Sequence, residues 1–89
     1  MADYITHRDR LITGMVQTES LINRTARKWT AINVADFHSQ AANLISDIRA
    51  AKEDASEAEW QSLAERLQTL HTDVFRVFHS GKIVRVGDG

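Results

Sequence analysis

The 89-residue chain contains no cysteine and no proline, and it has only four glycines, three of them after residue 80. Without cysteine the chain can form neither a disulfide nor a thiolate-ligated zinc site. The absence of proline and the scarcity of glycine favour long, uninterrupted helices, because these two residue types interrupt helices most strongly. A chain this short usually needs an additional source of stability, and association between copies is the common one that remains.

The sequence also lacks a long apolar run and a strong excess of charge. No apolar stretch approaches the roughly 18 residues of a transmembrane helix, and the N-terminal segment has no apolar core typical of a signal peptide. We therefore expect a cytoplasmic protein that makes no membrane contact. Eleven Lys and Arg residues stand against twelve Asp and Glu residues, for a net charge of −1. Nucleic-acid-binding domains usually carry a basic excess, so the charge argues against a nucleic-acid partner.

Two stretches of the chain have the apolar period of an amphipathic helix. The second of them follows Ser56, which begins an S-x-x-E capping box. We predict helices over residues 34–52 and 57–79, and we expect Gly81 to end the latter. The apolar residues repeat at spacings of three and four; they are Phe37, Ala41, Leu44, Ile48 and Ala51 in the first stretch, and Trp60, Leu63, Leu67, Leu70, Val74 and Val77 in the second.

The N-terminal part of the chain has a weaker helical pattern. Four apolar residues fall on one helical face, but Thr18 and Thr25 interrupt it. Gly14 lowers the helix propensity of the middle by about 1 kcal/mol relative to Ala. A loose capping box at Thr6 still favours a helix over residues 3–29. The four apolar residues are Leu11, Met15, Ile22 and Trp29.

Together these patterns predict one all-α domain over residues 1–89. We expect a three-helix up-down-up bundle, or a helical hairpin plus an N-terminal helix, with a short extended C-terminal tail over residues 80–89. The matched apolar stripes of the second and third helices, joined by a short break, predict that these two helices form the core hairpin. In this hairpin Phe37, Leu44 and Ile48 face Trp60, Leu63, Leu67, Leu70 and Val74.

No pattern in the sequence indicates catalysis. The chain has no Gly-x-Ser-x-Gly motif, and no glycine-rich phosphate loop occurs before residue 81. The histidines lack the i, i+4 spacing of a helical zinc motif. We therefore predict no catalytic residue, no metal site and no cofactor, and we expect a protein that is not an enzyme. The four histidines are His7, His38, His71 and His79.

Two basic groups lie at the ends of the first and third predicted helices. Basic side chains at a helix C-terminus complement the helix dipole, which is the simplest interpretation of both groups. No acidic residue lies between Ser20 and Val34, and if the fold joins the two groups they can hold a phosphate or an acidic partner. The first group comprises Arg24, Arg27 and Lys28, and the second comprises Arg76, His79, Lys82 and Arg85.

The end of the third helix and the tail carry apolar residues in excess of what one neighbouring helix covers. The first helix is one candidate to cover Phe75 and Phe78, and a second chain is the other. Ile83 and Val84 belong to a β-prone tail in a chain with no second strand. A symmetric contact between copies would cover both features at once. We predict a homodimer or larger closed oligomer with Phe75, Phe78, Ile83 and Val84 at the contact.

These observations favour a non-enzymatic helical interaction protein that is homo-oligomeric and binds another protein. The alternative is a helical protein that binds a nucleotide or another small anionic ligand through its Arg and Lys clusters. A DNA-binding module ranks third, because the second predicted helix does not expose the mixture of Arg, Lys, Asn and Gln typical of a recognition helix.

Overall fold

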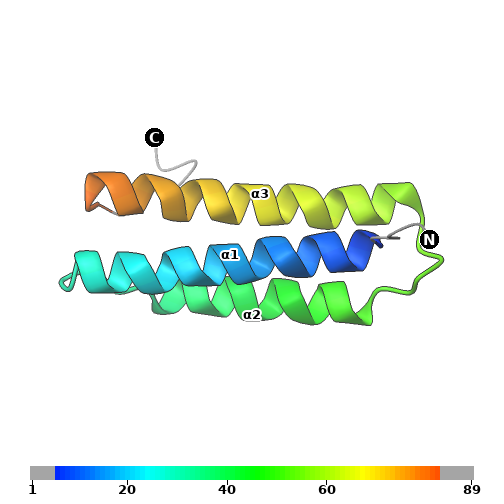
Figure 1. Ribbon diagram of the computed structural model, residues 1–89, viewed down its shortest axis with the longest axis horizontal. Coiled ribbons are helices and arrows are strands. Elements are labelled where there is room, and N and C mark those ends of the chain that lie inside the picture. The colour runs from blue at the N-terminus through cyan, green and yellow to red at the C-terminus, as the bar shows by residue number, and fades with distance from the viewer. Residues whose placement is uncertain (1–5, 83–89) are drawn as a thin grey trace, which may run out of the picture.

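The computed structural model of the chain describes residues 6–82, and this part forms three α-helices without a strand. Helix α1 spans His7–Lys28, α2 spans Ala35–Ala50 and α3 spans Glu57–Ser80. The chain runs up, down and up again, so α1 and α3 point in the same direction and α2 in the opposite one (Figure 1). The predicted all-α three-helix bundle is confirmed. None of the helices within residues 6–82 combines the length and the apolar character that a membrane crossing requires.

Local signals in the sequence fix the start of α1 and both ends of α3. The Thr6 hydroxyl oxygen accepts a hydrogen bond from the Asp9 amide at 3.1 Å, and the Ser56 hydroxyl accepts one from the Glu59 amide at 3.2 Å. Both bonds satisfy amides that have no partner inside the helix. Helix α3 ends at Gly81, whose φ of 69° lies in the left-handed region that glycine adopts without strain.

Helix α2 is shorter than the predicted range 34–52 at both ends. The Asn33 side-chain oxygen accepts a hydrogen bond from the Ala35 amide at 2.9 Å, and this local turn delays the helix until Ala35. At the other end Ala51 has an extended backbone, so the helix stops at Ala50. Helix α1 ends one residue before the predicted limit of 29. The predicted residues 3–5 of α1, and residues 83–89 of the tail, lie outside the described residues.

Helix α1 contributes an unbroken core seam, and the prediction that threonines interrupt it was wrong. Thr18 and Thr25 are fully buried. Their hydroxyls donate to the carbonyls of Gly14 and Leu21 at 2.9 and 2.8 Å. Because each hydroxyl is satisfied within its own helix, the threonine methyl can pack as a valine methyl would. The full seam, at spacings of 4, 3, 4, 3 and 4, is Leu11, Met15, Thr18, Ile22, Thr25 and Trp29.

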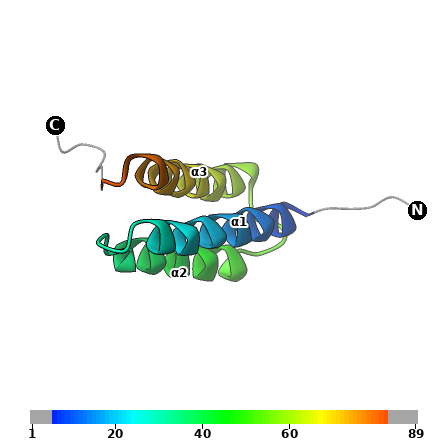
Figure 2. The same cartoon turned by 60° about the vertical axis from the view of Figure 1, so that its left-hand side comes forward.

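The core lies between all three helices and is not centred on the α2–α3 hairpin. The contact between α1 and α3 is the most extensive of the three, and the contact between α2 and α3 is the smallest. In Figure 2, α3 lies on one side of the pair formed by α1 and α2. The prediction that α2 and α3 form the centre of the core was therefore wrong. The apolar seam of α1 is more complete than predicted, so α1 is the common partner of the other two helices.

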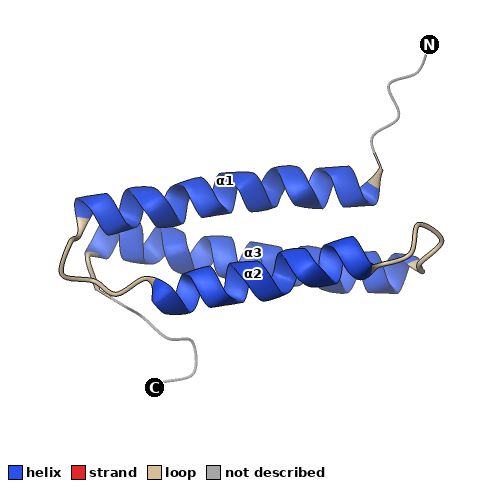
Figure 3. Cartoon of the chain, turned by 90° about the horizontal axis from the view of Figure 1, so that it is seen from below, coloured by secondary structure: helices blue, strands red, loops and turns tan. Residues whose placement is uncertain are grey.

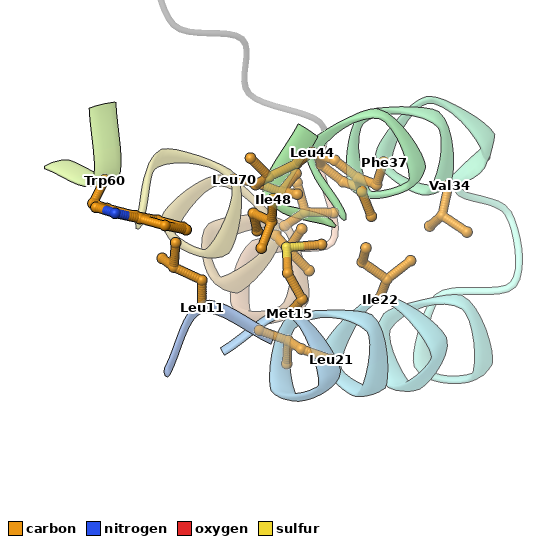
Figure 4. Close-up of a cluster of buried hydrophobic side chains, with 13 residues drawn as sticks. Leu11, Met15, Leu21, Ile22, Val34, Phe37, Leu44, Ile48, Trp60 and Leu70 are labelled. Atoms are coloured by element: carbon orange, nitrogen blue, oxygen red, sulfur yellow. The ribbon is translucent and has the colours of Figure 1, made fainter. Parts of the chain in front are cut away.

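The buried side chains of the three helices converge in one cluster (Figure 4). Most of the residues that we expected in the hairpin are buried there, but Leu63 and Leu67 are only half-buried at its edge. The buried apolar residues are Leu11, Met15, Leu21, Ile22, Val34, Phe37, Ala41, Leu44, Ile48, Trp60, Leu70, Val74 and Val77.

Helix α1 also anchors the C-terminal end of α2. The Arg8 guanidinium donates a hydrogen bond to the carbonyl of Ala51, the capping residue of α2, and lies 3.8 Å from the Glu53 carboxylate. A cation at this position complements the negative end of the helix dipole. The loops that join the helices lie at opposite ends of the bundle (Figure 3), so Arg8 sits beside the α2–α3 connection.

Gly14 lets α1 and α3 approach closely. A Cβ atom at position 14 would lie only 2.6 Å from Cδ2 of Leu67. Leu67 thus packs over the backbone of α1, which explains why it is not at the centre of the α2–α3 contact. The lower helix propensity of Gly14, about 1 kcal/mol relative to Ala, is offset by this contact between helices.

We predict that the size of residue 14 controls stability. Gly14→Ala should change the free energy of unfolding by less than about 1 kcal/mol, because the gain in helix propensity offsets a shift of the flexible Leu67 side chain. Gly14→Leu should destabilise the protein by about 1–3 kcal/mol, because it overpacks the contact. Urea denaturation followed by circular dichroism measures both. Equal stability of the Leu variant and the wild type would show that α1 and α3 are not in contact here.

Candidate functional site

The parallel direction of α1 and α3 places the C-terminal ends of both helices at one end of the bundle (Figure 1). Side chains from the two predicted basic groups meet there around Phe78. The Arg24 guanidinium carbon lies 5.2 Å, and the Lys28 ammonium 4.4 Å, from the centre of the Phe78 ring. Both distances are those of cation–π contacts. We call Arg24, Lys28, Phe75, Phe78 and His79 the end cluster.

The aromatic part of the end cluster is open to solvent. Phe78 is half-buried beneath the two cations of α1, whereas Phe75 is 49% exposed. The His79 ring meets both phenyl rings edge-on, with centroid distances of 4.3 Å to Phe75 and 5.6 Å to Phe78. Cover by the first helix, one of the two expected arrangements, thus holds for Phe78 but leaves Phe75 largely uncovered.

Trp29 holds the two helix ends together beside the end cluster. Its indole Nε1 donates a hydrogen bond of 2.7 Å to the carbonyl of Phe78. Its ring packs on Gly81 so closely that a Cβ there would lie 3.0 Å from ring carbon Cε3. Two features therefore favour glycine at position 81: the left-handed backbone conformation, and the Trp29 ring that leaves no space for a Cβ atom. This fixes the position of the cations of α1 relative to the rings of α3.

The parts of α1 and α3 that form the end cluster carry basic residues and no acidic ones. Neither residues 20–34 nor residues 74–82 contain an acidic side chain. Two helix C-termini, each with a partial negative charge, lie at this end, and the cations complement them. The side chains of Arg24 and Lys28 nevertheless remain exposed. A partner that offers both carboxylates and an apolar group fits such a surface.

Not every predicted binding residue joins the end cluster. Arg27 is exposed in the last turn of α1. Arg76 lines a different surface groove along α3, whose lining also includes Glu65 and Asp73. Arg76 is two residues from Phe78 on α3, so helical phase places the two side chains on different sides of the helix, and the part of Arg76 in binding stays a prediction. The acidic context further reduces the positive field that Arg76 can offer.

The remaining predicted residues lie at or beyond the limit of the described chain. Lys82 is exposed, and its amide donates to the Ser80 hydroxyl at 3.2 Å just after α3 ends. The predicted binding residue Arg85 and the predicted contact residues Ile83 and Val84 lie outside the described residues.

A second surface feature, which the sequence reasoning missed, lies at the opposite end of α1 and α3. The His7 ring stacks on Trp60 with a centroid distance of 5.6 Å, and its Nε2 lies 3.0 Å from the Glu57 carboxylate. Up-down-up order places the starts of α1 and α3 together, which was the one available signal. We call this concavity of about 260 Å³ the Trp60 groove; it is lined by His7, Arg10, Leu11, Glu57, Trp60, Gln61 and Ala64.

Neither feature resembles a metal centre in the part of the chain that the structure describes. No group of three or more His, Asp or Glu side chains within residues 6–82 is arranged to hold a metal ion. Comparisons with known protein families, with curated proteins and with solved structures found no match. The chemistry that the end cluster offers is recognition through charge and aromatic surface.

We predict that the Trp29 hydrogen bond contributes measurably to stability. Trp29→Phe keeps a ring over Gly81 but leaves the Phe78 carbonyl without its donor, so it should lower the free energy of unfolding by about 1 kcal/mol. Trp29→Ala also removes the packing and should cost about 2–4 kcal/mol. Urea denaturation monitored by circular dichroism measures both values. A Phe variant with wild-type stability would mean that the indole donor is not engaged.

Proposed function

We propose that this protein is a non-enzymatic interaction protein whose end cluster binds an acidic, partly apolar surface of another protein molecule. One observation carries the proposal: two acid-free stretches from different helices meet around Phe78, where Arg24 and Lys28 contact its ring and the exposed Phe75 lies one turn away on α3. A cytoplasmic location, expected from the sequence, belongs to the same proposal.

The geometry gives each component of the end cluster a role in binding. Covering the exposed Phe75 ring removes apolar surface from water, which favours association by about 25 cal/mol per Å². The cations of α1 attract carboxylates and increase the rate of encounter. Contact with the Phe78 ring already restrains Arg24 and Lys28, so less side-chain entropy is lost when a partner binds.

A nucleotide or other small anionic ligand is the second candidate, because Arg24 and Lys28 converge on one ring. The negative ends of two parallel helices at this site weaken the attraction for a small anion. An extended acidic segment can instead place its carboxylates on the cations and an apolar side chain on Phe75. The test below therefore includes ATP beside a peptide.

We predict that a glutamate-rich synthetic peptide containing two leucines binds the protein and that reversing two charges weakens this binding. Trp60→Phe leaves Trp29, beside the end cluster, as the only fluorescent reporter of titration. In that background Arg24→Glu with Lys28→Glu should lower the affinity about tenfold or more, which corresponds to about 1.4 kcal/mol. Added salt should weaken the wild-type interaction, since exposed charges are screened.

The matched control is the double variant Arg49→Glu with Lys52→Glu. It changes two exposed basic residues at and just after the C-terminal end of α2, at the opposite end of the bundle from the end cluster. It changes the net charge by the same amount, so an effect of overall charge alone would appear in both double variants. Equal loss in both variants, or no peptide binding by the wild type at a concentration at which it is monomeric, would contradict the proposal. Binding of ATP with no binding of the peptide would favour the second candidate.

A further inference from the structure

We infer that the Trp60 groove receives the Phe75 ring of a second copy of this chain, so that two copies pair antiparallel along α3. Each end cluster then covers the groove of the other copy. This inference rests on the proposed function, because it identifies the partner surface that the end cluster binds.

The exposed ring and the groove lie on the same face of α3. A second heptad-like series runs along this helix beside the core seam, at spacings of 4, 3, 4, 3 and 4, and residues so spaced share one helical face. Near its start this face carries polar residues and one small residue, and near its end it carries aromatic residues. It comprises Glu57, Gln61, Ala64, Gln68, His71 and Phe75.

A two-fold axis across the middle of this face makes the two features complementary. In an antiparallel pair, the register that sets Phe75 of each copy opposite Ala64 of the other also sets Gln68 opposite His71. An isologous contact uses both features of both copies at once and leaves no open end for further growth. Ala64 is half-buried and small, so it leaves space above it for a ring.

The groove has the size and the chemistry to hold a phenyl ring. An apolar cavity of about 150 Å³ accommodates benzene, and the Trp60 groove measures about 260 Å³. Its lining includes the apolar residues Leu11 and Trp60 together with the cation of Arg10. Arg10 can therefore contact the incoming ring as Lys28 contacts Phe78 within one copy.

The distribution of charge selects the antiparallel arrangement. Residues 53–65 contain five acidic and no basic side chains, and residues 74–82 contain no acidic ones. Antiparallel pairing brings the start of α3 in one copy to its end in the other, so Glu57 of each copy faces Lys82 of the other. A parallel pair would place like charges together. A second copy of this chain thus supplies the acidic, partly apolar surface that the end cluster fits.

The first experiment measures mass by light scattering at high micromolar concentration. The wild type should have twice the chain mass of 10.1 kDa, and Phe75→Ala should have the mass of one chain. The matched control is Val16→Ala on α1, which truncates the other large apolar residue that is exposed within residues 6–82, at 61%, and should remain dimeric. Because both residues are exposed, neither change should alter the circular dichroism spectrum. A wild type that is monomeric, or a Phe75→Ala variant that stays dimeric, overturns the inference.

The second experiment tests the register and uses the absence of cysteine from the chain. Gln68→Cys places a thiol beside the proposed two-fold axis, so a short bismaleimide should convert most of this variant into covalent dimer. Ala42→Cys places a thiol at a position on α2 that is also exposed and should remain largely uncrosslinked. Equal crosslinking at both positions, or more at position 42, overturns the antiparallel pairing.

The glutamate-rich peptide separates this inference from the proposed function. A monomeric wild type that binds the peptide overturns the pairing and leaves the proposed function standing. A monomer that does not bind the peptide overturns both.

Discussion

The close, parallel approach of α1 and α3 determines most of what this structure can do. It depends on Gly14, where no side chain separates the α1 backbone from Leu67. Because the two helices run in the same direction, their ends coincide, and the cations of one reach the rings of the other. An antiparallel arrangement of the same two helices would place Arg24 far from Phe78 and would open no groove between His7 and Trp60.

The three helices, and the helix ends that a capping residue marks, could be predicted because they depend on local signals. The capping residues Thr6 and Ser56 and the terminator Gly81 act on amides and carbonyls a few residues away, and the structure confirms all three. Packing between helices was harder to predict. A threonine hydroxyl reads as polar in the sequence, yet Thr18 satisfies its hydroxyl within its own helix and packs as an apolar residue. The benefit of Gly14 depends on Leu67, which lies far from it in the sequence.

The residue types of the candidate site could be predicted from the sequence, but which of these residues face one another could not. Sequence indicated two basic groups that could meet, and Arg24 and Lys28 do meet α3 at Phe78. Which members of each group face the partner helix depends on the rotation of each helix about its axis, and Arg76 lines a groove elsewhere on α3 instead. The Trp60 groove could not be predicted because its two sides come from distant parts of the chain, and the apolar pattern around Trp60 predicts only a core residue.

The two anchors at the ends of α1 have a consequence for the order in which the chain can fold. Arg8 engages the carbonyl that ends α2, and Trp29 engages the carbonyl of Phe78 near the end of α3. The second contact joins residues 49 positions apart. A nascent chain emerging from the ribosome therefore lacks the acceptor for Trp29 until the last turn of α3 has been synthesised. Because the contact between α1 and α3 is the most extensive of the three, we expect a stable bundle to form only once α3 has been synthesised.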